Sequence, residues 1–190
     1  MPIRKKKKKN RNGNPDQLGH TDAVISLALN NFKKNILVSG SADQTVKIWD
    51  LTTQKVAMTE NIGAKPDSVA WHPENESVLF VATDDHTIKA ADIRDKKEIG
   101  SYKFDTSIES FCFDHSNEEI HLSFENGYMG GIDFRDGFKP SYELKVSKKS
   151  ITSVAANPKV KGMLGSTSTD SVIRIYNSGN RDQKNCPSLV

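Results

Sequence analysis

The chain has 190 residues, of which 27 are basic and 24 acidic, and its composition is 35% hydrophobic and 7% aromatic. No apolar run reaches the roughly 18 residues that a membrane-spanning helix needs, and no apolar segment follows the basic N-terminus as in a secretory signal. Two cysteines are too few for a disulfide framework or a zinc site. We therefore expect one domain with a core of its own, in a reducing intracellular compartment.

The first 18 residues hold a dense run of positive charge and almost nothing that could be buried. The basic side chains of the run are Arg4, Lys5, Lys6, Lys7, Lys8, Lys9 and Arg11. Without these seven side chains the full sequence keeps 20 basic residues against 24 acidic ones. Such a tail predicts disorder, with a role as a nuclear or nucleolar address, as a contact to RNA phosphates, or as both. A solvated linker is the alternative.

Residues 19–50 contain a recognisable unit. It opens with Gly19-His20, closes with Trp49-Asp50, and holds two apolar runs with polar residues between them. We expect strands at 23–29, 35–41, 45–49 and 54–59, with Asp43-Gln44 as a two-residue hairpin turn. A Gly-His opening and a Trp-Asp close are typical of a WD40 propeller blade.

The unit recurs along the chain. The turn residues Asp43, Asp85, Asn126 and Asp170 are 42, 41 and 44 residues apart, within the WD40 period. A second marker, formed by Ser26, Ser68, Ser110 and Ser153, keeps the same period. The sequence predicts an all-β protein with blades at 19–60, 61–100, 101–143 and 144–177, each a four-stranded antiparallel sheet, and a loop-like segment at 178–190. Since four shallow blades closing on themselves would need an unusual curvature, we expect part of a seven-bladed ring from a truncated or alternative gene product.

Four polar residues of the first blade form a candidate site. His20, Ser39 or Ser41, and Asp43 together suggest a Ser-His-Asp hydrolase, but no G-x-S-x-G elbow accompanies them. The alternative is a structural hydrogen-bond network that also uses Trp49. It accounts for all four residues, so we expect no enzyme. The other histidines lack metal-ligand spacing, so we expect no metal and no cofactor.

Two arginines follow successive third strands in matching D-x-R elements. Arg94 follows Asp92 and Arg135 follows Asp133. They could form a docking surface for a cullin-ligase adaptor. The alternative is a local ion pair with the preceding aspartate, which we favour because short motifs match by chance.

The lysine run followed by GHTDAV and then SADQTVKIWDL resembles periodic tryptophan protein 1, a nucleolar WD40 family. The resemblance implies a non-enzymatic scaffold in the nucleus and nucleolus. It would act in ribosome biogenesis and large-subunit pre-rRNA processing, binding pre-ribosomal proteins and touching rRNA through the basic tail. A histone-binding chromatin adaptor and a cullin-ligase substrate receptor remain alternatives. We expect no membrane partner and no small-molecule substrate.

Overall fold

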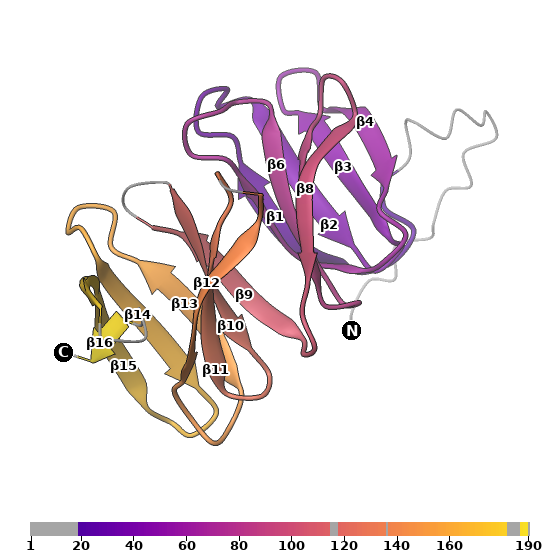
Figure 1. The fold of residues 1–190 in the computed structure, drawn as a ribbon. Coiled ribbons are helices and arrows are strands. Elements are labelled where there is room, and N and C mark those ends of the chain that lie inside the picture. The colour runs from indigo at the N-terminus through magenta and orange to yellow at the C-terminus, as the bar shows by residue number, and fades with distance from the viewer. Residues whose placement is uncertain (1–18, 115–117, 136, 182–186, 190) are drawn as a thin grey trace, which may run out of the picture.

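The computed structural model describes residues 19–114, 118–135, 137–181 and 187–189, and the predicted disordered tail at 1–18 lies outside them. Within these ranges the chain forms strands and no helix, arranged as four antiparallel sheets of four strands each (Figure 1). The prediction of an all-β protein built from propeller blades is confirmed. No helix in the described ranges could cross a membrane.

Each sheet consists of four strands that are consecutive in the chain. Blades one and two contain β1 (Val24–Leu29), β2 (Ile36–Ser41), β3 (Thr45–Asp50), β4 (Lys55–Asn61), β5 (Pro66–Trp71), β6 (Val78–Thr83), β7 (Thr87–Asp92) and β8 (Lys97–Lys103). Blades three and four contain β9 (Ile108–Phe113), β10 (Glu119–Phe124), β11 (Tyr128–Asp133), β12 (Lys139–Lys145), β13 (Ile151–Ala156), β14 (Met163–Ser168), β15 (Ile173–Arg181) and β16 (Pro187–Leu189). The strands β4, β8 and β12 end one to three residues after the predicted blade divisions.

The loop between the second and third strands has the same geometry in every blade. In blade one it spans residues 42–44, one more than the predicted two-residue turn, and the Gln44 N–H donates to the Ser41 carbonyl oxygen at 3.1 Å. The third residue of this loop has a left-handed φ in all four blades: 65° at Gln44, 70° at His86, 83° at Gly127 and 68° at Ser171, which one further residue separates from β15. A three-residue hairpin loop ending in a left-handed residue matches the twist of the flanking strands. The predicted turn residues therefore occupy equivalent corners of four successive sheets.

The outermost strand of blade four corrects one prediction. Residues 178–190 were expected to form a loop, but β15 continues to Arg181 and β16 pairs antiparallel with it, with Leu189 opposite Tyr176 and Ser188 opposite Asn177. The three-residue sequence Pro-Ser-Leu of β16 is too short to show an alternating pattern that would predict a strand. Its pairing follows from the unpaired N–H and C=O groups along the edge of β15, which only the folded sheet presents.

The core lies between the sheets. The second strands of blades two and three are covered on both faces, so every residue of β6 and β10 is buried. Blades one and two meet over Val38, Val46, Ile48, Val69, Trp71, Leu79 and Val81. Blades two and three meet over a larger cluster that includes Phe80, Ile88, Phe111, Leu122 and Phe124. Blades three and four meet over Met129, Tyr142, Ile151, Val154, Leu164 and Tyr176.

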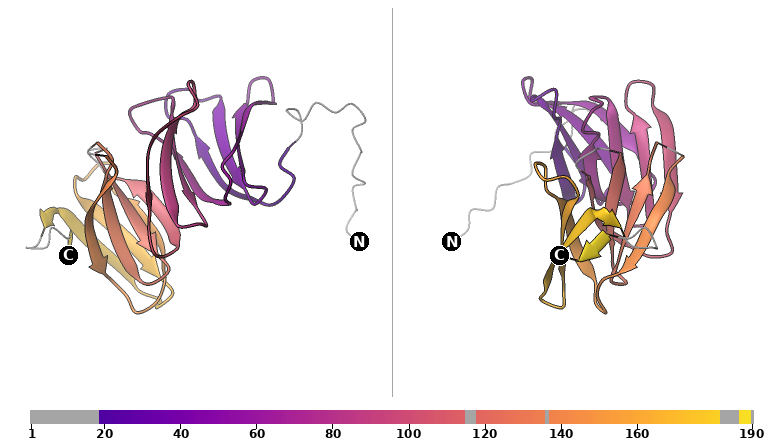
Figure 2. Two further views of the ribbon diagram at one scale, coloured as in Figure 1. Left: turned by 45° about the vertical axis from the view of Figure 1, so that its right-hand side comes forward. Right: turned by 60° about the vertical axis from the view of Figure 1, so that its left-hand side comes forward.

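The four sheets follow one another in chain order along an open arc (Figure 2). The inner strands of blades one and two are also joined by a hydrogen bond of 3.0 Å from the Val69 N–H to the Ser26 hydroxyl, one of the repeat markers. The two sheets at the ends of the arc carry exposed apolar side chains. Leu27 and Leu29 of β1 are 62% and 58% exposed, and Ile173 of β15 is 73% exposed.

Candidate functional site

Four side chains of blade one form a continuous hydrogen-bond network. His20 lies in the segment before β1, Ser39 on β2, Asp43 in the following loop and Trp49 on β3. His20 Nδ1 lies 3.0 Å from Asp43 Oδ2, and His20 Nε2 lies 2.7 Å from Ser39 Oγ. The Trp49 Nε1–H donates to Ser39 Oγ at 2.8 Å. The structure thus brings together all four residues that the sequence suggested.

The antiparallel register explains why these residues meet. Ser39 on β2 pairs with Lys47 on β3, and Trp49 lies two residues further along β3, on the same face of the sheet. The loop at residues 42–44 returns the chain beside β2, which places Asp43 next to the segment that carries His20. With its proton on Nδ1, His20 donates to Asp43 and accepts from Ser39, so that every polar group of the network has a partner.

Asp43 is the charged member of the network, and its side chain is only 8% exposed. Desolvation on burial acts to raise the pKa of Asp43, but hydrogen bonds outweigh it and hold that pKa well below its usual range. The Thr45 hydroxyl donates at 2.6 Å, and the backbone N–H of Thr21 donates at 2.9 Å. Asp43 therefore remains ionised and fixes the loop before β1 to the loop between β2 and β3.

The same geometry bears on the hydrolase alternative. Ser39 is 2% exposed, and its Oγ already accepts a hydrogen bond from Trp49. A serine nucleophile must instead face a substrate carbonyl and an oxyanion hole. The described contacts of Ser39 all lie within its own blade, as the structural interpretation expects.

Blade four carries a related network that the sequence analysis did not identify. Ser147 precedes β13 by four residues, as His20 precedes β1, and its Oγ donates to Asp170 Oδ2 at 2.7 Å. Arg174 donates to both oxygens of the same carboxylate, at 2.7 and 3.3 Å. The pKa of Asp170 is held well below its usual range, first by Arg174 and then by Ser147. The spacing to the next strand was the signal that could have revealed Ser147.

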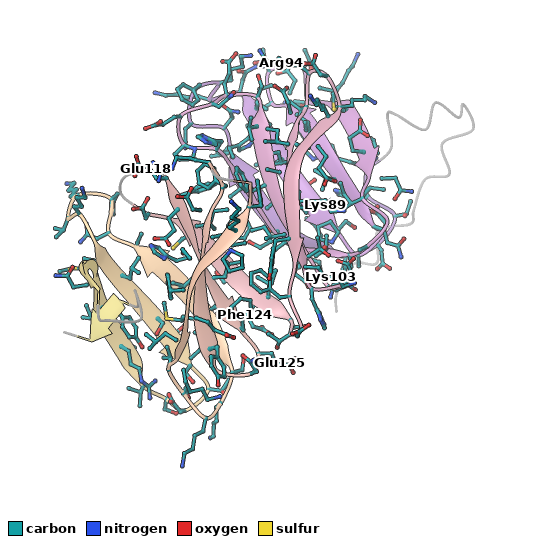
Figure 3. The ribbon with its side chains drawn as sticks, viewed as in Figure 1. Lys89, Arg94, Lys103, Glu118, Phe124 and Glu125 are labelled. Carbon is teal, nitrogen blue, oxygen red and sulfur yellow. The ribbon has the colours of Figure 1, made fainter. Side chains whose placement is uncertain are left out.

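Arg94 and Arg135 each form an ion pair with the aspartate two residues earlier. Arg94 Nη2 lies 2.7 Å from Asp92 Oδ2, and Arg135 Nη2 lies 2.9 Å from Asp133 Oδ2. Arg135 Nη1 also pairs with Glu118 Oε1 at 2.8 Å. Arg94 lies at the end of blade two that is uppermost in Figure 3. Both arginine side chains remain more than half exposed. This local pairing is the arrangement that the simpler interpretation predicts, and a partner could still reach either arginine.

No group of three or more metal-binding side chains occurs in the described ranges. His72 packs among the rings of Phe80, Phe113 and Phe134, and burial lowers its pKa. His121 is fully buried, with Nδ1 2.8 Å from the Tyr142 hydroxyl. His72 thus contributes to the packing between blades two and three, and His121 contacts Tyr142 within blade three.

Four-stranded sheets in series with WD-type corners define a WD40-repeat β-propeller protein. Residues 14–50 match the family model "WD domain, G-beta repeat". The β-propeller domain of Cps50 (Swd1) from Myceliophteria thermophila superposes with a TM-score of 0.76 at 19% identity, over 91% of this chain and 58% of that one.

The predicted resemblance to the periodic tryptophan protein 1 family is also confirmed. The chain is 27% identical to the periodic tryptophan protein 1 homolog of Drosophila melanogaster, over 93% of this chain and 40% of the relative. It is 31% identical to periodic tryptophan protein 1 of Saccharomyces cerevisiae, over 76% of this chain and 27% of the relative. A 66-residue stretch is 42% identical to the ribosome biogenesis protein BOP1 homolog of Aedes aegypti, covering 34% of this chain and 8% of that protein. The chain thus spans less than half the length of these relatives.

Proposed function

We propose that this chain is a non-enzymatic scaffold of ribosome biogenesis that acts in the nucleolus on large-subunit pre-rRNA. The observation that carries the proposal is the similarity to periodic tryptophan protein 1 over most of the chain, in a fly and in a yeast. The similarity to a ribosome biogenesis protein over a shorter stretch supports the same process. A propeller suits such a role, because its rigid sheets hold many loops that partners can contact.

In this proposal the two parts of the chain have different tasks. The blades contact pre-ribosomal proteins through their loops, and the basic tail contacts rRNA. The blade region carries fewer basic than acidic residues, so electrostatic attraction to RNA should be concentrated in the tail. The network of His20, Ser39, Asp43 and Trp49 would then serve to hold the loops of blade one in place.

The proposal predicts that RNA binding depends on the tail and on salt. Replacing the five lysines at positions 5–9 with glutamine should weaken binding to a pre-rRNA fragment. It should also reduce the slope of log K against log salt by up to about 3.5, since each contact to a single strand contributes about 0.7. Filter binding or fluorescence anisotropy at several salt concentrations measures both quantities.

The matched control replaces five exposed lysines of the blades with glutamine: Lys34, Lys55, Lys97, Lys159 and Lys161. This variant has the same net charge as the tail variant, and its salt slope should stay close to that of the original chain. Equal losses in the two variants, or binding that does not respond to salt, would contradict a specific role for the tail.

A further inference from the structure

A basic hollow lies where the chain passes from β12 into blade four. It has a volume of about 490 Å³ and is open to solvent. Its charged lining consists of four cations and one acid: Lys145, Lys148, Lys149, Arg174 and Asp170. Asp170 is already paired with Arg174 at 2.7 Å, so the net positive charge of the hollow comes from the three lysines, which are all exposed.

This positive charge is specific to blade four. Lys148 and Lys149 follow Ser147, which precedes the first strand of its blade by four residues, as His20 does in blade one. The same two positions of the other blades hold no basic side chain: Thr21 and Asp22, Gly63 and Ala64, and Asp105 and Thr106. Since the blade region carries fewer basic than acidic residues, the lysines of this hollow do not reflect its overall composition.

A second hollow, of about 420 Å³, is lined by aromatic rings and adjoins the basic one. The half-buried rings of Tyr102, Phe104 and Tyr128 line it, together with the buried ring of Phe124 (Figure 3). Lys145 Nζ lies 4.3 Å from the centroid of the Tyr128 ring. Because Lys145 lines the basic hollow and Tyr128 the aromatic hollow, the two are neighbours.

The two hollows together carry more positive than negative charge. The charged lining of the aromatic hollow consists of Lys103, Asp105 and Glu143, all exposed. Both hollows together therefore have five cations against three acids. Asp105 and Glu143 belong to the aromatic hollow, so the excess of positive charge lies in the basic hollow. An anionic group fits there, and an uncharged flat ring fits beside it.

The two hollows also lie at the end of the blades where the basic tail joins. In blade one the contact of His20 with Asp43 places the segment before the first strand beside the loop between the second and third strands. The contact of Ser147 with Asp170 does the same in blade four. Gly19, where the tail joins, directly precedes His20, so the tail and the basic hollow belong to the same end of the sheets.

We propose that the two hollows bind single-stranded RNA, with backbone phosphates in the basic hollow and a base in the aromatic hollow. A positively charged groove beside aromatic rings is the arrangement by which proteins hold single strands without reading their sequence. Lysines suit the successive phosphates of a backbone. The one guanidinium group, which could hold a phosphoryl group through paired hydrogen bonds, is already bound by a carboxylate, and this favours RNA over a phosphorylated peptide. The inference rests on the proposed role with pre-rRNA and adds a contact in the blades to that of the tail.

The test uses the full chain with the lysines at positions 5–9 replaced by glutamine, so that the tail does not mask the blades. The probe is fluorescein-labelled hexauridylate, and fluorescence anisotropy follows its binding at several salt concentrations. The slope of log K against log salt should have a magnitude of about 2, since each of the three lysine contacts contributes about 0.7. Replacing Lys148 and Lys149 with glutamine should reduce that magnitude by about 1.4.

Two further variants assign the binding to the two hollows. The matched control replaces Lys159 and Lys161 with glutamine, because these exposed lysines lie at the opposite end of the same blade, in the loop between β13 and β14. It should leave the slope unchanged. Tyr128→Leu removes a ring but no charge, so it should weaken binding about tenfold and also leave the slope unchanged. Circular dichroism checks that each variant is folded.

Equal slopes for the Lys148→Gln, Lys149→Gln variant and its matched control would overturn the proposal. Displacement of the labelled RNA by the acetylated, amidated peptide Gly-phosphoserine-Gly more readily than by unlabelled hexauridylate would also overturn it, and would identify a phosphopeptide site instead. Loss of all salt-dependent binding when lysines 5–9 are replaced would leave the role of the tail intact and rule out the site in the blades. If that replacement changes nothing, the role of the tail is wrong, and the lysine variants of blade four still decide the inference.

Discussion

Asp43 is the residue at which the hydrogen bonds of blade one converge. It accepts from His20, from the Thr21 backbone and from Thr45, and it keeps its charge although its side chain is almost covered. In blade two the equivalent Asp85 accepts from the Thr83 hydroxyl at 2.6 Å and is exposed. The two aspartates occupy the same corner of the repeat, so their different surroundings can be compared directly.

We expect Asp43→Asn to lower the free energy of unfolding at pH 7 by about 2 kcal/mol, because hydrogen bonds to a buried charge are lost. The pKa of Asp43 is lowered in the folded state, so its stabilising effect is present above the unfolded pKa of about 3.9 and is lost as the pH falls. The difference between the two proteins should therefore narrow below about pH 4. Urea unfolding at pH 7, 5 and 3 measures it.

Asp85→Asn is the comparison for this experiment and should have a smaller effect at pH 7. A difference between Asp43→Asn and the original chain that stays constant from pH 7 to pH 3 would show that the charge of Asp43 is not what stabilises the blade.

At the scale of the element, the left-handed loop residue is accommodated in two ways. Blade three uses Gly127, and the other blades use Gln44, His86 and Ser171. The backbone of Gly127 packs closely against the segment leading into blade four, since its carbonyl oxygen accepts from the N–H groups of Val146 and Ser147. An added Cβ would collide with the carbonyl oxygens of Ser147 and Lys149. Glycine is needed there both for its conformation and for the close approach.

We expect Gly127→Ala to destabilise the protein by about 2–4 kcal/mol, from left-handed strain together with the collision. Gln44→Ala changes an exposed residue that already has the same backbone conformation, so it should change stability by less than about 0.5 kcal/mol. Chemical unfolding of both variants provides the measurement. Similar effects in the two would mean that the contact with Ser147 and Lys149 can relax.

At the scale of the whole molecule, stability depends on three interfaces in series. Each apolar cluster among the described residues joins two consecutive blades, as in other repeat proteins. The interface between blades two and three is built around Phe80, which is 1% exposed and contacts the rings of Phe113, Phe134 and Phe138 at centroid distances of 5.0, 5.4 and 5.9 Å. Loss of this one side chain should weaken the link between the two halves of the arc.

We expect Phe80→Ala to cost about 3–5 kcal/mol and to separate the unfolding of blades one and two from that of blades three and four. The only two tryptophans, Trp49 and Trp71, lie in the first half, so their fluorescence reports on that half alone. Circular dichroism reports on all strands. The midpoints from the two methods should differ in this variant.

Phe32→Ala, which removes an exposed ring, should unfold with the same midpoints as the original chain. Coincident midpoints in Phe80→Ala would mean that the four blades remain one cooperative unit.

The sequence by itself determined the repeat, its four turn residues and three members of the blade-one network, and it narrowed the fourth member to Ser39 or Ser41. These features depend on residues that lie close together in the chain or on one strand-to-strand register, so a periodic pattern records them. The tertiary structure decided the pairing of β16, the Ser147–Asp170–Arg174 contacts and the junction of the basic and aromatic hollows. Each of these features depends on which surfaces meet across a sheet edge or between blades. Local patterns in the sequence do not record those contacts.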